Sequence, residues 1–308
     1  MPMEHTNPPA GWALTLARHA RNHPLSFAGL VVAVVALGVL GHGISGDAAP
    51  QAGTHVLWAF YGGMAGFAAT TVGALPVLFL RGLPQRVEDV MLGGAAGMML
   101  AAAFFSLLLP ALEAGEGLTG SSWMGAFLVV GGIGAGVLLM LGIDAFTPHE
   151  HDRSGPCGPG HERCNRVWLF IFAIAIHNLP EGMAIGVSFA QGDLGVALPM
   201  TAAISLQDIP EGLAVAMTLR TIGVSAVKAV GVAAAGGLLE PVGAVLGVML
   251  VGNSLAAYPV GLGLAAGAML FVVSHEVIPE THRNGHQTAA TLGLMAGFAL
   301  MMVLDTAL

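Results

Sequence analysis

The sequence predicts an all-α integral membrane protein with nine transmembrane helices. Only 9% of its 308 residues are charged, whereas a soluble domain carries about 25% charged residues. The mean hydropathy is positive, and most of the apolar runs approach the roughly 20 residues that a helix needs to cross a bilayer. The 45 glycines are typical of helices that pack closely in lipid. We therefore expect the lipid bilayer as a partner, and no nucleic acid.

The chain opens with a polar segment, residues 1–24, which we expect on the cytoplasmic side. An apolar run follows from residue 25 to about residue 41, and we interpret residues 25–53 as an extra N-terminal transmembrane helix with its outer loop. This run is short for a span and could instead be the apolar part of a signal peptide, with Ala48 and Ala49 as small residues for cleavage. We favour the retained helix.

Residues 54–308 are predicted to form one domain that contains the other eight apolar runs. These runs cover residues 56–80, 90–112, 123–143, 167–190, 194–219, 229–251, 255–273 and 289–304. If the N-terminus is cytoplasmic and the chain alternates sides, all ten Lys and Arg residues fall inside. The acidic residues that fall outside, with no basic residue among them, are Asp47, Glu113, Glu116, Asp193 and Asp305. This sorting follows the positive-inside rule, so we predict a bacterial inner (plasma) membrane protein with its C-terminus outside.

A short repeat links two of the runs. The sequence AAGMML at residues 95–100 is nearly repeated as AAGAML at residues 265–270. In the predicted topology the two copies cross the membrane in opposite directions, as in the inverted repeats of secondary transporters. A chance match between helices rich in Ala, Gly and Met is the alternative.

Two similar motifs lie about midway along adjacent runs. They read HNLPEG at residues 177–182 and QDIPEG at residues 207–212. On a helix, the two polar residues and the glutamate of each motif share one face. These residues are His177, Asn178 and Glu181 in the first motif and Gln207, Asp208 and Glu211 in the second. Each proline frees the carbonyl four residues earlier and kinks the helix beside the carboxylate.

These carboxylates need a positive partner. A charged side chain at the bilayer centre costs about 2.5–3.5 kcal/mol on insertion scales and usually marks function. No Lys or Arg lies in any apolar run, so protons or a bound cation must neutralise the carboxylates. Imidazole, carboxylates and amides together suit Zn²⁺ or another first-row divalent ion. The carboxylates exceed what one tetrahedral zinc requires, so we predict one or two ions per chain, with Glu181 and Glu211 bridging a pair.

Two residues outside the motifs are further candidates for the metal site. Glu240 precedes a proline midway along the run at 229–251; it could instead be a protonated glutamate bonded to a neighbouring helix. Met99 could add a thioether, although a methionine on an apolar face usually serves packing. Asn178, Gln207 and Asp208 could alternatively satisfy the carbonyls that the prolines free.

A polar loop, residues 145–166, separates the runs at 123–143 and 167–190. Its Gly- and Pro-rich centre, residues 155–160, cannot be helical. Its strongest candidate metal ligands are His149, His151, Cys157, His161 and Cys164. We interpret it as a mobile cytoplasmic loop that collects metal, the alternative being a polar connector. The segments 275–276 and 280–282 could form an inner relay, or simply a solvated helix end.

The paired motifs resemble the transport site of the ZIP family of divalent-metal transporters. Residues 177–182 match the family's first motif, and residues 207–212 stand where the second belongs. The resemblance covers the chain from residue 56 to its end. It implies an eight-helix unit of three, two and three helices with inverted pseudosymmetry, to which the first helix is an addition. It also implies transport of zinc and related metals into the cytoplasm through a mid-membrane site that is often binuclear.

The second motif departs from the family pattern. The family usually has His where this chain has Gln207, and often Asn or Glu where it has Asp208. Because a neutral amide binds zinc more weakly than imidazole does, we expect Cd²⁺, Fe²⁺ or Mn²⁺ to pass as well. The Gly- and Ala-rich helix faces would also permit a homodimer.

Two other functions explain less of the sequence. An intramembrane zinc-dependent hydrolase would need three protein ligands and an open water position; the chain lacks a His-Glu-x-x-His motif, and hydrolysis needs no duplicated site. A proton-driven carrier of an organic solute would not explain His177 or the loop histidines. We therefore predict a metal transporter and not an enzyme.

Overall fold

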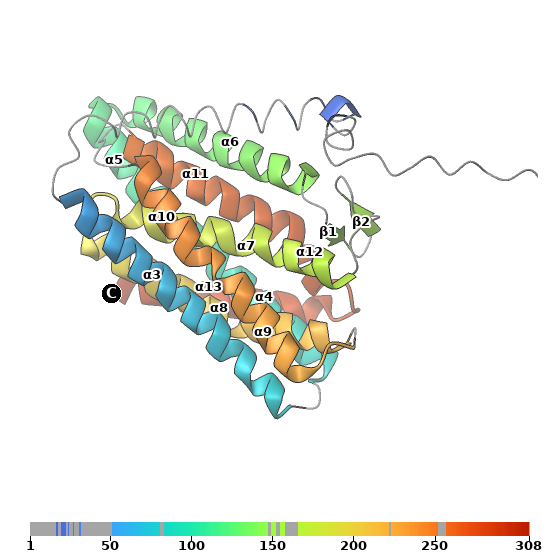
Figure 1. Cartoon of the computed structure of the whole chain (residues 1–308). Coiled ribbons are helices and arrows are strands. Elements are labelled where there is room, and N and C mark those ends of the chain that lie inside the picture. The colour runs from blue at the N-terminus through green and yellow to red at the C-terminus, as the bar shows by residue number, and fades with distance from the viewer. Residues whose placement is uncertain are drawn as a thin grey trace, which may run out of the picture.

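The computed structural model is a bundle of helices with one short pair of strands (Figure 1). It describes residues 51–80, 83–146, 149–151, 155–157, 166–221, 223–251 and 257–307, with isolated positions between residues 17 and 31. Apart from those isolated positions, the predicted polar segment 1–24 and the predicted first helix, residues 25–41, lie outside the described residues.

Eight helical units follow one another in the described part of the chain, and each coincides with one of the eight predicted runs in residues 54–308. They are α3 (Gln51–Ala74) with the 3₁₀ turn η1 (Leu75–Leu78); α4 (Gln85–Ala102), the π-helical segment η2 (Ala103–Leu108) and α5 (Leu109–Thr119); α6 (Ser122–Phe146); α7 (Arg166–Phe189); α8 (Leu194–Thr221); α9 (Ala226–Gly237) and α10 (Leu239–Val251); α11 (Ala257–Val272), the π-helical segment η4 (Val273–Val277) and α12 (Ile278–Thr281); and α13 (Gln287–Ala307). Six units are long and apolar enough to cross a membrane, and the remaining two, α7 and α8, are 24 and 28 residues long but carry the polar motifs.

Some helix ends lie beyond the predicted apolar runs. The unit that begins with α4 continues past residue 112 to Thr119, and the unit that begins with α11 continues past residue 273 to Thr281. These extensions carry polar residues, which can remain helical once the chain leaves the apolar layer. The apolar length of a run therefore predicts the span but not the full helix.

The structure confirms the inverted repeat, and glycine contacts show it most clearly. A Cβ on Gly73 of α3 would collide with the Ile209 carbonyl of α8, and a Cβ on Gly243 of α10 would lie 2.5 Å from the Leu179 carbonyl of α7. The helices that begin the two halves, in α3 and α9–α10, are the first and sixth of the eight units and therefore run in opposite directions. Close approach through small residues is how helices associate in lipid, where apolar burial gives no driving force between them.

The other helices of the two halves repeat the same pattern. Glycines of α4 pack against carbonyls of α13, and the corresponding glycines of α11 pack against carbonyls of α6. Each half also contains a π-helical segment at the matching place, η2 after α4 and η4 after α11. Single π-turns inside helices often occur at functional sites.

These contacts divide the described helices into two sets. The motif bundle consists of α3, α7, α8, α9 and α10, and the support bundle consists of α4, α5, α6, α11, α12 and α13. Every glycine whose added Cβ would meet backbone of another helix, among the described residues, has that partner in its own bundle. Across the boundary the contacts involve side chains, as between Gly261 of α11 and Val187 of α7.

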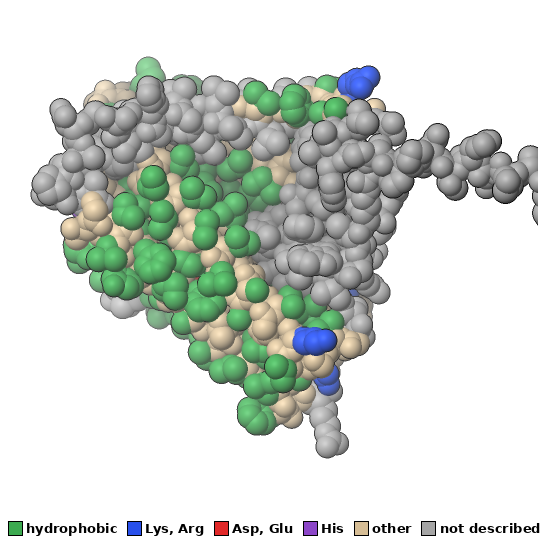
Figure 2. All heavy atoms as spheres, in the orientation of Figure 1, with side chains coloured by type: hydrophobic (Ala, Val, Ile, Leu, Met, Phe, Trp, Pro, Cys, Tyr) green, Lys and Arg blue, Asp and Glu red, His purple; other side chains and the backbone are tan. Residues whose placement is uncertain are grey.

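The outer surface suits a lipid environment. Large apolar side chains face outward on several helices, with Trp123 of α6 80% exposed and Val227 of α9 74% exposed. Among the described side chains on the face seen in Figure 2, hydrophobic ones predominate and basic ones are few. This distribution agrees with an integral membrane protein.

The polar loop contains a short antiparallel pair of strands rather than an unstructured tether alone. Strand β1 (His149–His151) pairs with β2 (Gly155–Cys157), and the register places His149 opposite Cys157. β1 lies beside α7 (Figure 1). The expectation that the Gly- and Pro-rich centre is not helical is confirmed for residues 155–157. The side chains of the loop, and His161 and Cys164 entirely, lie outside the described residues.

Candidate metal centre

The two motifs lie inside adjacent helices, α7 and α8, and each helix continues through its motif proline. Pro180 and Pro210 have no N–H, so each removes one helical hydrogen bond beside the motif glutamate. A side-chain bond joins the two motifs directly: Gln207 Nε2 donates to Glu181 Oε1 over 2.8 Å. The amide nitrogen of Gln207 is therefore hydrogen-bonded to the first motif.

Four carboxylates gather where these helices meet, and we refer to them as the central carboxylate cluster. Its members are Glu181 of α7, Asp208 and Glu211 of α8, and Glu240 of α10. One ligand oxygen from each of Glu181, Asp208 and Glu211 lies within 4.8 Å of the others. Glu181 and Asp208 are 1% and 2% exposed, Glu240 is fully buried, and Glu211 is half-buried.

Several oxygens of this cluster and of the adjoining Gln207 have no hydrogen-bond donor. They are Glu181 Oε2, Gln207 Oε1, Asp208 Oδ2 and Glu240 Oε2, all buried. A buried acceptor without a partner costs about 1–3 kcal/mol, and an unpaired buried charge costs more. A divalent cation fits this group, because it would satisfy the buried oxygens and neutralise the carboxylates.

Helix α3 positions Glu240, although the sequence predicts no site residue on this helix. The Thr70 hydroxyl lies 3.0 Å from Glu240 Oε1. On the same helix, Gly66 leaves room for the other carboxylate oxygen, because a Cβ there would collide with Glu240 Oε2 and lie 3.1 Å from Asp208 Oδ2. Glu240 is therefore bonded to a neighbouring helix, as the alternative interpretation required, yet it still presents an oxygen to the cluster.

For three predicted ligands, the structure shows no hydrogen bond to the cluster among the described atoms. Asn178 is buried, at 3% exposure, on α7 beside the cluster. His177 lies in α7, but its side chain is outside the described residues. Met99 is 1% exposed on α4 and belongs to the apolar core shared by the two bundles. The ligand roles of these three residues stay predictions.

A second group of possible ligands lies at the end of the bundle that carries β1 and β2. Asp144 at the end of α6 and His275 and Glu276 of η4 bring ligand atoms within 4.8 Å of one another. His275 Nε2 is 4.0 Å from Asp144 Oδ2, and its ring stacks on Phe271 at 4.9 Å. The sequence indicated the pair at 275–276; Asp144 was missed because it directly follows an apolar run as an ordinary helix-end residue would.

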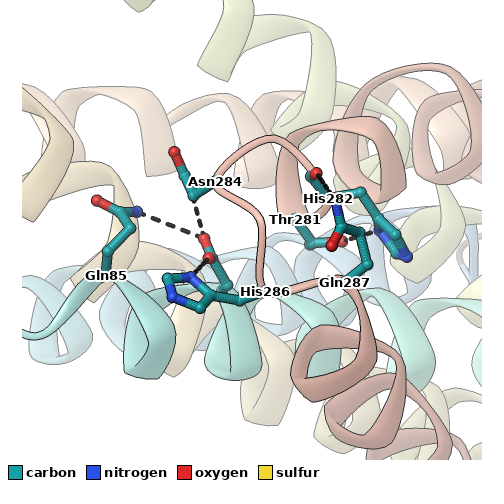
Figure 3. Close-up of polar contacts among 7 residues, drawn as sticks. Gln85, Thr281, His282, Asn284, His286 and Gln287 are labelled. Atoms are coloured by element: carbon teal, nitrogen blue, oxygen red, sulfur yellow. Dashed lines mark hydrogen bonds and ion pairs between the residues drawn. The ribbon is translucent and has the colours of Figure 1, made fainter.

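The neighbouring polar residues form a structural network (Figure 3). Asp89 at the start of α4 accepts hydrogen bonds from Asn284 (2.9 Å), His286 (2.8 Å) and, at 3.4 Å, Gln85. His282 Nδ1 lies 2.9 Å from the Ile278 carbonyl, so this ring caps its own helix. The segment 280–282, expected as an inner relay or a solvated helix end, thus anchors the turn between α12 and α13.

A pocket opens beside this network, at the boundary of the two bundles. It is lined by residues of α4 and α12 from the support bundle and of α8 from the motif bundle, among them Glu88, Thr218 and Glu280. Arg283 also borders it and donates to Glu280 over 3.0 Å. Thr218 lies on α8 two helical turns beyond Glu211, so the pocket and the cluster share one helix.

The sequence model of the ZIP zinc transporter family matches residues 148–305. The chain is 57% identical over 296 residues to the zinc transporter ZIPB of Bordetella bronchiseptica, and the match covers 94% of each chain. The chain belongs to the ZIP family. It is also 43% identical over 242 residues to the zinc transporter GufA of Myxococcus xanthus, covering 78% of this chain and 94% of that one. Identity to the zinc transporter ZIP11 of Homo sapiens is 28% over 339 residues, covering 84% of this chain and 99% of that one.

Membership confirms the family prediction made from the two motifs. Because this ZIP family is one of metal transporters, the chain is a transporter and not an enzyme, and the interpretation as an intramembrane zinc hydrolase is set aside.

Proposed function

We propose that this protein carries divalent transition-metal ions, zinc foremost, across the membrane into the cytoplasm. The observation that carries the proposal is the central carboxylate cluster, four carboxylates that include buried oxygens without donors. Such a group is stable only with protons or a cation, and the two motifs that supply three of its members also contain the amides and imidazole that divalent transition metals accept. The named zinc transporters among its relatives support zinc as the first substrate.

The ligand set is proposed from both motifs and their surroundings. Glu181 and Glu211 bridge two ions when two are bound, and both bind the same ion when only one is bound. The remaining proposed ligands are His177, Asn178, Gln207, Asp208, Glu240 and Met99. Because Gln207 offers an amide oxygen in place of an imidazole, Cd²⁺, Fe²⁺ and Mn²⁺ are proposed as further substrates.

The division into two bundles supports a carrier rather than a fixed pore. All proposed ligands except Met99 belong to the motif bundle. Within each bundle, glycines let the backbones of neighbouring helices come into contact. Across the boundary, the described glycines meet only side chains of the other bundle. The motif bundle can therefore move against the support bundle with the ion in place, which is how inverted-repeat transporters alternate access.

We propose that release occurs at the end carrying β1 and β2. The positive-inside sorting places this end, with residues 1–24 and loop 145–166, in the cytoplasm and the C-terminus outside. The group of Asp144, His275 and Glu276, and the pocket beside Glu280, provide carboxylates near this end. They can accept the ion after it leaves the cluster. We also propose that the protein resides in the bacterial inner membrane and forms a homodimer.

The function is tested by uptake into proteoliposomes of Zn²⁺, Cd²⁺, Fe²⁺ and Mn²⁺, with and without a proton gradient. The protein should transport zinc, and Glu181→Ala or Glu211→Ala should abolish transport, because each change strands carboxylates without the ion they share. Glu113→Ala is the matched control, since Glu113 is an exposed glutamate on α5. Wild-type zinc uptake by both cluster variants would overturn the site.

A further inference from the structure

Helix α3 carries no acidic residue, yet it forms one wall of the central carboxylate cluster. Thr70 and Gly66, one helical turn apart, both face Glu240 of α10. The inverted repeat explains this meeting: Thr70 and Glu240 are 170 residues apart and occupy corresponding positions of the two halves. The helices α3 and α10 therefore approach each other at this pair.

The Thr70 hydroxyl can donate its proton to either of two acceptors. It is 5% exposed, and its Oγ1 lies 3.0 Å from Glu240 Oε1 and 3.3 Å from the Gly66 carbonyl. A hydroxyl has one proton to donate, and an ionised carboxylate can only accept. When Glu240 is ionised, the proton of Thr70 therefore goes to Glu240, whose bond is also the shorter one.

Gly66 determines where the second oxygen of Glu240 can lie. An added Cβ at Gly66 would occupy the place of Glu240 Oε2 and would lie 3.1 Å from Asp208 Oδ2. Both of these oxygens are buried without a hydrogen-bond partner. The absence of a side chain at Gly66 thus lets two unpartnered acceptors from α8 and α10 come together.

We infer that Thr70 is a positioning residue for metal binding and that Gly66 provides the space in which it acts. Thr70 holds Glu240 Oε1, so the carboxylate presents only Oε2 beside Asp208. Presentation of one oxygen suits an ion such as Zn²⁺, which binds carboxylate oxygens at about 2.0–2.2 Å in a four-ligand shell. The inference rests on the proposed function, because it assigns how one ligand of that site is aimed.

The inference is tested with Thr70→Val, which keeps the shape of the side chain and removes its hydroxyl. The apparent KM for zinc uptake should rise about tenfold, as expected for the loss of one hydrogen bond to a charged group, while the maximal rate is retained. Thr70→Ser should restore the wild-type KM. Thr71→Val is the matched control, because the Thr71 hydroxyl donates within its own helix, to the Phe67 carbonyl at 2.8 Å.

A double-mutant cycle separates positioning from a general structural role. In a Glu240→Ala background, Thr70→Val should cause no further change in zinc affinity, because Thr70 acts through that carboxylate. If Thr70→Val does not fold, Gly66→Ala decides: it should weaken zinc binding in wild type and add nothing in the Glu240→Ala background.

Distinct results overturn the inference and the proposed function. A wild-type KM in Thr70→Val, an equal rise in Thr71→Val, or an additive effect in Glu240→Ala would overturn the inference while Glu181→Ala remained inactive. Wild-type uptake by Glu181→Ala would instead rule out the central carboxylate cluster as the transport site.

Discussion

Gln207 combines two roles in one side chain. Its Nε2 donates to Glu181 Oε1 over 2.8 Å, while its buried Oε1 has no partner. The amide therefore ties the two motifs together and leaves an oxygen that binds metal only weakly. An imidazole at this position would provide a stronger ligand.

We predict that Gln207→His tightens zinc binding and sharpens selectivity for zinc. Imidazole replaces an amide in a site whose other members are unchanged, so zinc should gain more than Mn²⁺, which prefers oxygen ligands. Competition between Zn²⁺ and Cd²⁺ or Mn²⁺ in uptake measures the effect. An unchanged preference would mean that Gln207 faces away from the ion.

The sequence singles out the motif residues because the motif is repeated and its carboxylates are conspicuous among apolar residues. It does not single out Thr70 or Gly66. A threonine and a glycine are ordinary in an apolar helix, and only the crossing of α3 and α10 brings them to Glu240. Residues that act by shape or by one hydrogen bond become visible once the packing is known.

At the level of elements, the start of α4 is fixed by one buried carboxylate. Asp89 is 3% exposed and accepts hydrogen bonds from the turn between α12 and α13, through Asn284 and His286. It thereby joins the two halves of the support bundle at the end where we propose release.

We predict that Asp89→Ala lowers the free energy of unfolding by about 2 kcal/mol, because the change leaves partly buried donors without their acceptor. Thermal unfolding in detergent measures this loss. Glu116→Ala, which removes an exposed acceptor of the Ser122 hydroxyl, should cost much less. Equal stability of the two variants would show that the network does not hold the turn.

The loop at 145–166 gives a second prediction at this scale. We expect replacement of all five of its His and Cys residues by Ser to change the rate of zinc uptake or its regulation by internal zinc. The preference among metals should stay intact, because the ligands that we propose to select the metal lie on α7 and α8. Those five residues are His149, His151, Cys157, His161 and Cys164. Loss of all metal binding in this variant would move the primary site to the loop.

At the scale of the whole molecule, the division into two bundles predicts where motion occurs. A Cβ at Gly261 of α11 would lie 3.4 Å from Val187 Cγ1 of α7, across the boundary, once the Val251 side chain of α10, with which that Cβ would collide, has shifted. Two cysteines at these positions can approach the separation that a disulfide needs. A Cβ at Gly62 of α3 would lie 2.7 Å from Ile185 Cγ2, within the motif bundle.

We predict that a disulfide between Gly261→Cys and Val187→Cys stops uptake and that reduction restores it. The pair Gly62→Cys and Ile185→Cys should remain active when oxidised, because it links helices that move together. Both pairs are built on a chain in which Cys157 and Cys164 are Ser, and uptake is measured before and after reduction. Full activity of the oxidised pair across the boundary would refute the movement of one bundle against the other.

The number of helices in residues 54–308 could be read from the sequence, whereas their pairing could not. Apolar runs of sufficient length identify the units, and the repeat at 95–100 and 265–270 indicates the symmetry. Which helix lies beside which depends on glycines such as Gly93 and Gly297, whose neighbours are backbone atoms of Ala290 and Gly94. In a chain with 45 glycines, such positions are recognisable only once both partners are known.

The central claim is that zinc binds at the central carboxylate cluster, and locating the ion tests it most directly. Crystals grown with Zn²⁺ should be measured with X-rays above and below the zinc absorption edge. The anomalous difference should peak among Glu181, Asp208 and Glu211, and the peak should vanish in Glu181→Ala. A peak confined to Asp144, His275 and Glu276, or to the loop at 145–166, would contradict the claim.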